Sequence, residues 1–127
     1  MPLRAPWPEL RQIALTQVEA TLAALPQRLR ERAQALPVTF EPRPNRLQRR
    51  DGIEPDTLGL FVGPDLDEEA HCLSPLPPQI ILFLENLWEE AGGDLQVFQE
   101  EVRTTYLHEL GHFLGLDEQG LIDRGLE

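Results

Sequence analysis

The stretch His108-Glu109-Leu110-Gly111-His112-Phe113-Leu114-Gly115-Leu116-Asp117-Glu118 is the most informative part of this 127-residue chain. On an α-helix, residues four apart differ by only about 40° around the axis and about 6 Å along it, so the His108 and His112 imidazoles can reach one metal ion. Glu109 lies beside the pair, where a carboxylate can polarise a metal-bound water rather than bind the metal. We expect a helix that carries a metal site here; the alternative is a solvated helix face that happens to hold two histidines.

The residues before this stretch predict one helix over residues 95–114. Asp94 is a good N-cap after the break at Gly92-Gly93. At about 100° per residue, the large apolar side chains fall on one stripe, and the two histidines lie on its margin. The stripe contains Phe98, Val102, Tyr106, Leu110, Phe113 and Leu114. The histidines should therefore line an open edge, with Tyr106 turned to the core.

Two glycines bear on the same helix. Gly111 is either tolerated inside it, at about 0.5–1 kcal/mol relative to alanine, or marks the close approach of another backbone. Gly115 stands where the helix should end, and a left-handed conformation there would carry Asp117 or Glu118 back towards the histidines. Ordinary C-capping would also explain Gly115.

The upstream half predicts helix and then short strands. Apolar residues at three- and four-residue spacing begin after Pro8 and predict a long helix over residues 9–36, broken or kinked at Pro26 and stopped by Pro37. Residues 38–40 and 57–62 are predicted strands, with a loop over residues 41–55 between them.

The middle of the chain is less regular. Residues 65–78 are acidic and rich in proline, which predicts a second loop. Residues 79–84 favour a strand followed by a helical turn near residues 85–91, although a core helix through Glu90 also fits this apolar run.

Charge is distributed unevenly along the chain. Residues 1–50 hold nine Arg and four Glu, a net +5, whereas residues 51–127 have a net charge of −16, which gives the overall −11. This acidity argues against a nucleic-acid partner, because phosphate contact needs a basic surface. Four arginines could form a local basic patch or a solvated loop that pairs with the acidic half: Arg43, Arg46, Arg49 and Arg50.

Length and cysteine content set further bounds. The chain is expected to form one domain over residues 1–127. No apolar run reaches the roughly 18 residues of a membrane helix, and the first residues lack a secretory apolar segment, so we expect no membrane partner. Cys72 is the single cysteine, which excludes internal disulfides and suits a reducing compartment. A cytoplasmic location is the expectation.

Residues 108–118 read HELGHFLGLDE, which resembles the extended zincin motif HExxHxxGxx(H/D/E). Thr104-Thr105-Tyr106 before the motif and Ile80-Ile81-Leu82-Phe83 further upstream also look like the small bacterial zincin-like metallopeptidase family, the minimal zincins. The resemblance covers roughly residues 55–126.

The resemblance implies an α+β domain in which helices pack a small, mixed, roughly three-stranded sheet and the motif lies on the C-terminal helix. It implies an edge strand above the metal, here residues 80–84, that pairs with an extended peptide. It also implies His108, His112 and Glu118 as zinc ligands and Glu109 as the general base.

On this interpretation the protein is a zinc-dependent metallopeptidase, a hydrolase that cleaves a peptide or protein substrate through a metal-bound water. The alternative is a non-catalytic zincin scaffold that binds a peptide or protein partner, with its metal site empty or structural. His71, the third histidine, could be an extra ligand or donor, or a surface loop residue.

Overall fold

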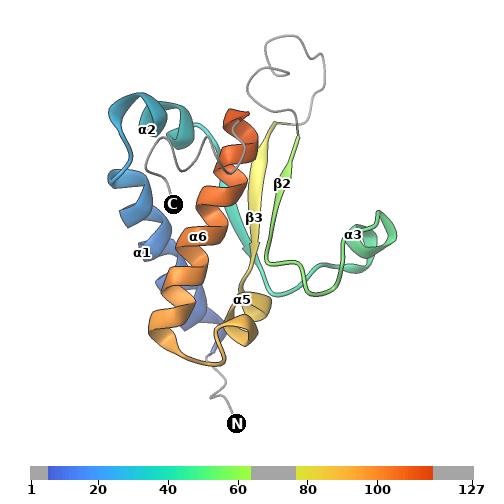
Figure 1. The fold of residues 1–127 in the computed structure, drawn as a ribbon. Helices are drawn as coiled ribbons and strands as arrows, with labels where there is room; N and C mark the ends of the chain where they lie inside the picture. Colours follow the sequence, from blue (N-terminus) through green and yellow to red (C-terminus); the bar gives the residue numbers. More distant parts are fainter. Residues whose placement is uncertain (1–5, 64–76, 116–127) are drawn as a thin grey trace.

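The computed structural model describes residues 6–63 and 77–115 of the chain. In this part, helices pack with the strands of one sheet (Figure 1). The helices are α1 (Trp7–Ala23), α2 (Gln27–Gln34), α3 (Arg46–Arg50), α5 (Leu84–Glu90) and α6 (Leu95–Leu114), and the strands are β1 (Val38–Glu41), β2 (Gly59–Val62) and β3 (Gln79–Phe83). The predicted α+β class, with the histidine motif on the last of these helices, is confirmed.

The sheet is mixed and has the strand order β1-β3-β2. Strand β1 runs parallel to β3, with Val38 opposite Ile80. Strand β2 runs antiparallel to β3, with Gly59 opposite Leu82. The apolar run that begins at residue 79 is therefore a strand, as predicted, and the chain enters helix α5 directly after it.

The prediction that this run forms the edge strand is wrong, because β3 lies at the centre of the sheet. The physical reason is visible in its composition. Ile80, Ile81, Leu82 and Phe83 are all buried, so both faces of β3 are covered, as expected for a strand between two neighbours. The edge that faces the motif helix belongs to β2 instead.

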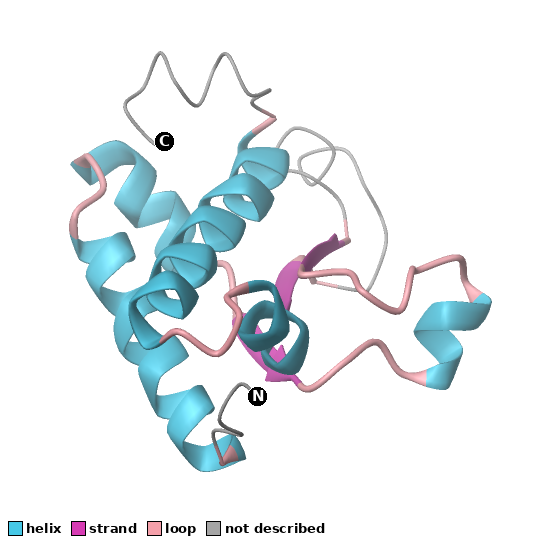
Figure 2. Ribbon diagram, turned by 60° about the horizontal axis from the view of Figure 1, so that its bottom comes forward, coloured by secondary structure: helices cyan, strands magenta, loops and turns pink. Residues whose placement is uncertain are grey.

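The helices α1 and α6 lie together on one side of the sheet (Figures 1 and 2). Ile80 and Leu82 of β3 point into the core between them. The core side chains of α1 are Leu10, Ala14 and Val18, and those of α6 include Phe98, Val102 and Leu110. Along the residues described, no helix combines the length and apolar content needed to cross a bilayer.

The predicted break at Pro26 is confirmed. Helix α1 ends at Ala23, and Pro26 becomes the N-cap of α2 with an extended backbone. The predicted loop over residues 41–55 needs a correction, because it contains the short helix α3. Asn45 and Gln48 form a reciprocal capping box at its start, and this local signal stabilises one helical turn without help from tertiary packing.

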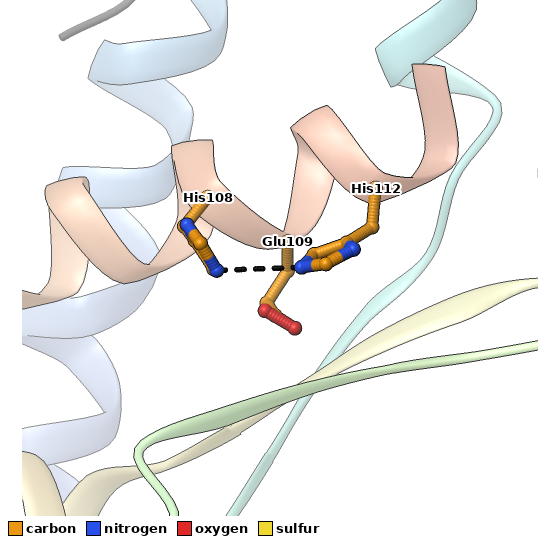
Figure 3. A group of neighbouring side chains, drawn as sticks. All are labelled: His108, Glu109 and His112. Carbon is orange, nitrogen blue, oxygen red and sulfur yellow. Dashed lines mark hydrogen bonds between the residues drawn. The ribbon is translucent and has the colours of Figure 1, made fainter. Parts of the chain in front are cut away.

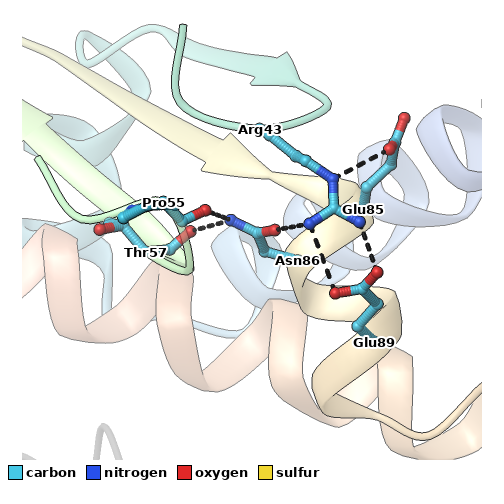
Figure 4. A network of polar contacts seen from close by, with 6 residues as sticks. All are labelled: Arg43, Pro55, Thr57, Glu85, Asn86 and Glu89. Atoms are coloured by element: carbon cyan, nitrogen blue, oxygen red, sulfur yellow. Dashed lines mark hydrogen bonds and ion pairs between the residues drawn. The ribbon is translucent and has the colours of Figure 1, made fainter. Parts of the chain in front are cut away.

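Arg43 anchors the segment that carries α3 to the acidic helix α5 (Figure 4). Its guanidinium pairs with Glu85 and Glu89, and the hydrogen bond to Arg43 lowers the pKa of the Glu89 carboxyl. This arginine thus pairs with the acidic half of the chain, one of the two alternatives that the sequence left open. Three other arginines, Arg46, Arg49 and Arg50, are exposed on α3, which stands away from the helices and the sheet (Figure 2).

Asn86 of α5 joins this network to the residues that lead into β2 (Figure 4). Its side chain is buried and accepts a hydrogen bond of 2.8 Å from Arg43 Nη1. Its amide nitrogen donates to the carbonyl oxygens of Pro55, at 2.8 Å, and Thr57, at 2.9 Å. One buried side chain therefore fixes where β2 begins.

Replacement of Asn86 by alanine should lower the free energy of unfolding by about 1–3 kcal/mol, because two carbonyl groups lose their shared donor in a buried place. Urea unfolding of the metal-free protein measures this change, and the slope of the transition should stay the same. Gln96→Ala, an exposed substitution on α6, is the control. Equal midpoints for the two variants would contradict the anchoring role of Asn86.

Candidate metal centre

Helix α6 begins and ends where the sequence predicted. The Asp94 side chain accepts a hydrogen bond of 3.0 Å from the backbone N–H of Val97 and so caps the first turn. Gly115 adopts the left-handed conformation (φ 72°, ψ 26°), and its N–H bonds back to the last turn of the helix. These two caps fix the ends of the helix that carries the motif.

The faces of α6 also agree with the prediction. The apolar side chains of the predicted stripe are buried except for Leu114, which is half-buried, and the Phe98 ring packs edge-on against Trp88 of α5 with ring centroids 5.5 Å apart. His108 and His112 are exposed on the margin of this stripe. Tyr106 is 1% exposed, and burial raises the pKa of its phenol to about 12. The tyrosine is therefore a neutral core residue.

The two imidazoles converge beside the helix (Figure 3). The Nε2 atoms of His108 and His112 lie 3.3 Å apart, and the rings are inclined at 80° to each other. Tetrahedral Zn²⁺ with Zn–N bonds of about 2.0–2.1 Å holds two nitrogen ligands about 3.3–3.4 Å apart. The spacing of the pair thus fits two adjacent positions of one zinc ion.

Glu109 lies on the inner side of the pair and points towards the sheet (Figure 3). Its side chain is only 8% exposed, in contrast to the two histidines. One carboxylate oxygen and the two imidazole nitrogens all lie within 4.8 Å of one another. A carboxylate in this place can exchange a proton with a water molecule bound beside the histidines.

Strand β2 forms the wall opposite Glu109. Gly59 packs so closely against the helix that an added Cβ would lie 2.5 Å from Thr105 Cγ2, and this Cβ would also reach ordinary contact, 3.4 Å, with Glu109 Cγ. Further along, the Phe61 ring packs against Phe113, with centroids 5.8 Å apart. The edge strand therefore runs beside the motif from Gly59 to Phe61.

The packing of β2 beside the motif helix was not predicted from the sequence. The signal that could have indicated it is Gly59 itself, because a glycine inside a strand pattern often marks the close approach of another backbone. Gly111 is buried, whereas Glu118, Asp117 and His71 lie outside the described residues. The structure therefore brings together His108, Glu109 and His112 of the predicted site.

A helix that presents two histidines and a glutamate beside the edge strand of a mixed sheet is the arrangement implied by the zincin resemblance. The family model of zincin-like metallopeptidases matches residues 33–126, and the chain belongs to this family. The match begins further upstream than the predicted residue 55, near the end of α2, and takes in the whole sheet. No curated protein matches the chain.

Proposed function

We propose that this protein is a zinc-dependent peptidase with His108, His112 and Glu118 as zinc ligands and Glu109 as the general base. The observation that carries the proposal is the 3.3 Å separation of the two exposed Nε2 atoms, with the Glu109 carboxylate next to them. Membership in the zincin-like metallopeptidase family also supports the proposal. We extend the proposal to the whole chain, residues 1–127, as one zincin-like domain.

The chemistry divides between the metal and the protein. His108, His112 and Glu118 would hold the zinc, which would act as a Lewis acid and make water a stronger nucleophile at neutral pH. Glu109 would accept a proton from the water that attacks the peptide carbonyl carbon, and it would give that proton to the amine nitrogen as the C–N bond breaks. Because its side chain is mostly buried against β2, the carboxylate has few alternative positions.

The edge of β2 supplies the binding surface for an extended peptide. Phe83 N–H donates to Leu58 O at 2.9 Å, so the Gly59–Leu82 pair next to it is a non-hydrogen-bonded pair of the antiparallel ladder. By the same alternation, Gly59 and Phe61 turn their N–H and C=O groups away from β3. In the described part of the chain no other strand pairs with this edge. A substrate backbone can pair there by strand addition, beside Glu109.

The third ligand is tested by two matched substitutions. Glu118→Gln should weaken zinc binding by at least about tenfold, since it removes a charged ligand, whereas Asp117→Asn should leave it nearly unchanged. Competition with a chromogenic chelator measures both affinities. The reverse order would identify Asp117 as the ligand.

The function is tested with zinc-loaded protein and an unbiased peptide library, followed by mass spectrometry of the new termini. We expect cleavage that disappears with a chelator and returns with Zn²⁺. Zinc retention without cleavage of any peptide would contradict the peptidase proposal and favour a non-catalytic module that binds a peptide or protein partner.

A further inference from the structure

Gly59 is a glycine because of space and not because of its backbone conformation. The glycines with positive φ in the described residues are Gly52, Gly63, Gly92, Gly93 and Gly115, and Gly59 is not among them. A Cβ added at Gly59 would lie 2.5 Å from Thr105 Cγ2, which is closer than real Cβ atoms come to another heavy atom, and 3.2 Å from Leu82 Cδ2. Any larger residue would therefore push β2 and α6 apart or move Thr105.

Glu109 lies on the same side of Gly59 as Thr105. The added Cβ would lie 3.4 Å from Glu109 Cγ, so the glycine backbone stands next to the stem of this side chain. In residues 6–63 and 77–115, no hydrogen-bond donor contacts the Glu109 carboxylate. Glu109 is nevertheless buried, with an exposed fraction of 8%. Within the described residues, packing beside β2 is therefore what restricts its position.

Gly59 also presents backbone groups to the open edge of the sheet. Its N–H and C=O point away from β3, as the ladder alternation requires. Gly59 therefore lies beside the stem of the proposed base and offers backbone pairing groups to a peptide at the edge of β2. A displacement of β2 would change the distance between the base and the peptide.

We propose that Gly59 is a positioning residue: the absence of a Cβ at this position lets β2 lie close to α6 and so sets the distance between the peptide-binding edge of β2 and the Glu109 carboxylate. The inference rests on the proposed peptidase function. To move from 2.5 Å to the 3.4 Å of an ordinary contact, β2 or Thr105 must shift by about 0.9 Å. A misplacement of about 1 Å near a reacting centre can lower the rate by about 10²-fold.

Thr105 provides the means to test this contact. It is β-branched, so its side chain has few alternative rotamers within a helix. Thr105→Ser deletes the Cγ2 atom that the added methyl group would meet, and it keeps the hydroxyl. The substitution should therefore remove the 2.5 Å contact for alanine at residue 59 and leave only a small adjustment of Leu82, whose Cδ2 would lie 3.2 Å from the new methyl group.

The experiment compares wild type, Gly59→Ala, Thr105→Ser and the double variant, all loaded with zinc. We expect Gly59→Ala to keep its zinc and lose about 10- to 100-fold in kcat/KM for an extended peptide. The double variant should recover to within about threefold of wild type, and Thr105→Ser alone should stay near wild type. Full activity of Gly59→Ala, or no recovery in the double variant, would overturn the proposal.

Gly92→Ala is the matched control. Gly92 has φ 65° and nothing within 4 Å of an added Cβ, so alanine there strains the backbone far from any contact with β2. It should lower the unfolding midpoint and leave kcat/KM unchanged at temperatures where the protein is folded, and Thr105→Ser should not correct it. If Gly92→Ala and Gly59→Ala lower the unfolding midpoint equally and also lower kcat/KM equally, the loss of activity in Gly59→Ala reflects stability alone and the proposal fails.

A second measurement does not depend on activity. In the metal-free protein, the midpoint of urea unfolding should fall in Gly59→Ala and return in the double variant, since the two residues are in contact. Independent effects of the two substitutions would overturn the contact itself. Absence of cleavage by wild type would overturn the peptidase function, whereas a failed recovery in an active protein would overturn only the role of Gly59.

Discussion

Glu109→Gln is expected to lower kcat/KM for peptide cleavage by about 10²- to 10⁴-fold while the protein keeps its zinc. Glutamine has the shape of glutamate, so it can occupy the mostly buried space beside β2. The glutamine amide cannot accept the proton of the attacking water. Glu109 is not one of the proposed zinc ligands. The loss should therefore appear in catalysis and not in metal binding.

The measurement combines initial rates on one cleaved peptide with the zinc content of the same preparation. Glu100→Gln is the matched control, because this glutamate is exposed on the same helix and should have no effect on the rate. Equal rates for wild type and Glu109→Gln would show that Glu109 is not the base. A loss of zinc in Glu109→Gln would instead make this residue a ligand.

His108→Ala and His112→Ala are each expected to weaken zinc binding by more than about 100-fold, since even the outer partners of zinc ligands change affinity by about 10- to 100-fold. Both side chains are exposed, so the metal-free proteins should unfold within about 0.5 kcal/mol of wild type. The difference should appear only when zinc is added.

Thermal unfolding with and without zinc measures this difference. Zinc at 100 times its Kd should stabilise wild type by about 2.7 kcal/mol and stabilise neither variant to that extent. Thr104→Ala, exposed on the same helix, is the control and should respond as wild type does. An unchanged zinc response in either histidine variant would show that the pair does not form the metal centre.

The elements that were predicted well have strong local signals. Helix α6 has a side-chain cap at Asp94, a continuous apolar stripe and a glycine stop at Gly115, and its predicted bounds match the structure. The break before α2 follows from Pro26, whose ring cannot continue a helix. Local chemistry determines these features, so the sequence is sufficient to predict them.

The arrangement of the strands depends on contacts between distant residues. Thr39 lies opposite Ile81, and Leu60 lies opposite the same residue on the other side. No local pattern specifies that β3 lies between two strands that come before it in the chain. Its fully apolar composition was compatible with a central strand, but the family resemblance had favoured an edge.

In the site, too, some features follow from local sequence and others depend on contacts between distant residues. The four-residue spacing of His108 and His112 on one helix was enough to predict their convergence, and Glu109 follows from its position between them. The contact of Gly59 with Thr105 joins residues 46 positions apart, and only the packing of β2 on α6 reveals it.

The most direct test of the zinc centre is a crystal structure of the zinc-loaded protein with anomalous data at the zinc edge. We predict one zinc ion bound by the Nε2 atoms of His108 and His112 at about 2.0–2.1 Å, with the Glu109 carboxylate beside the ion and outside its ligands. A zinc ion bound elsewhere, or coordinated by Glu109, would contradict the proposed centre.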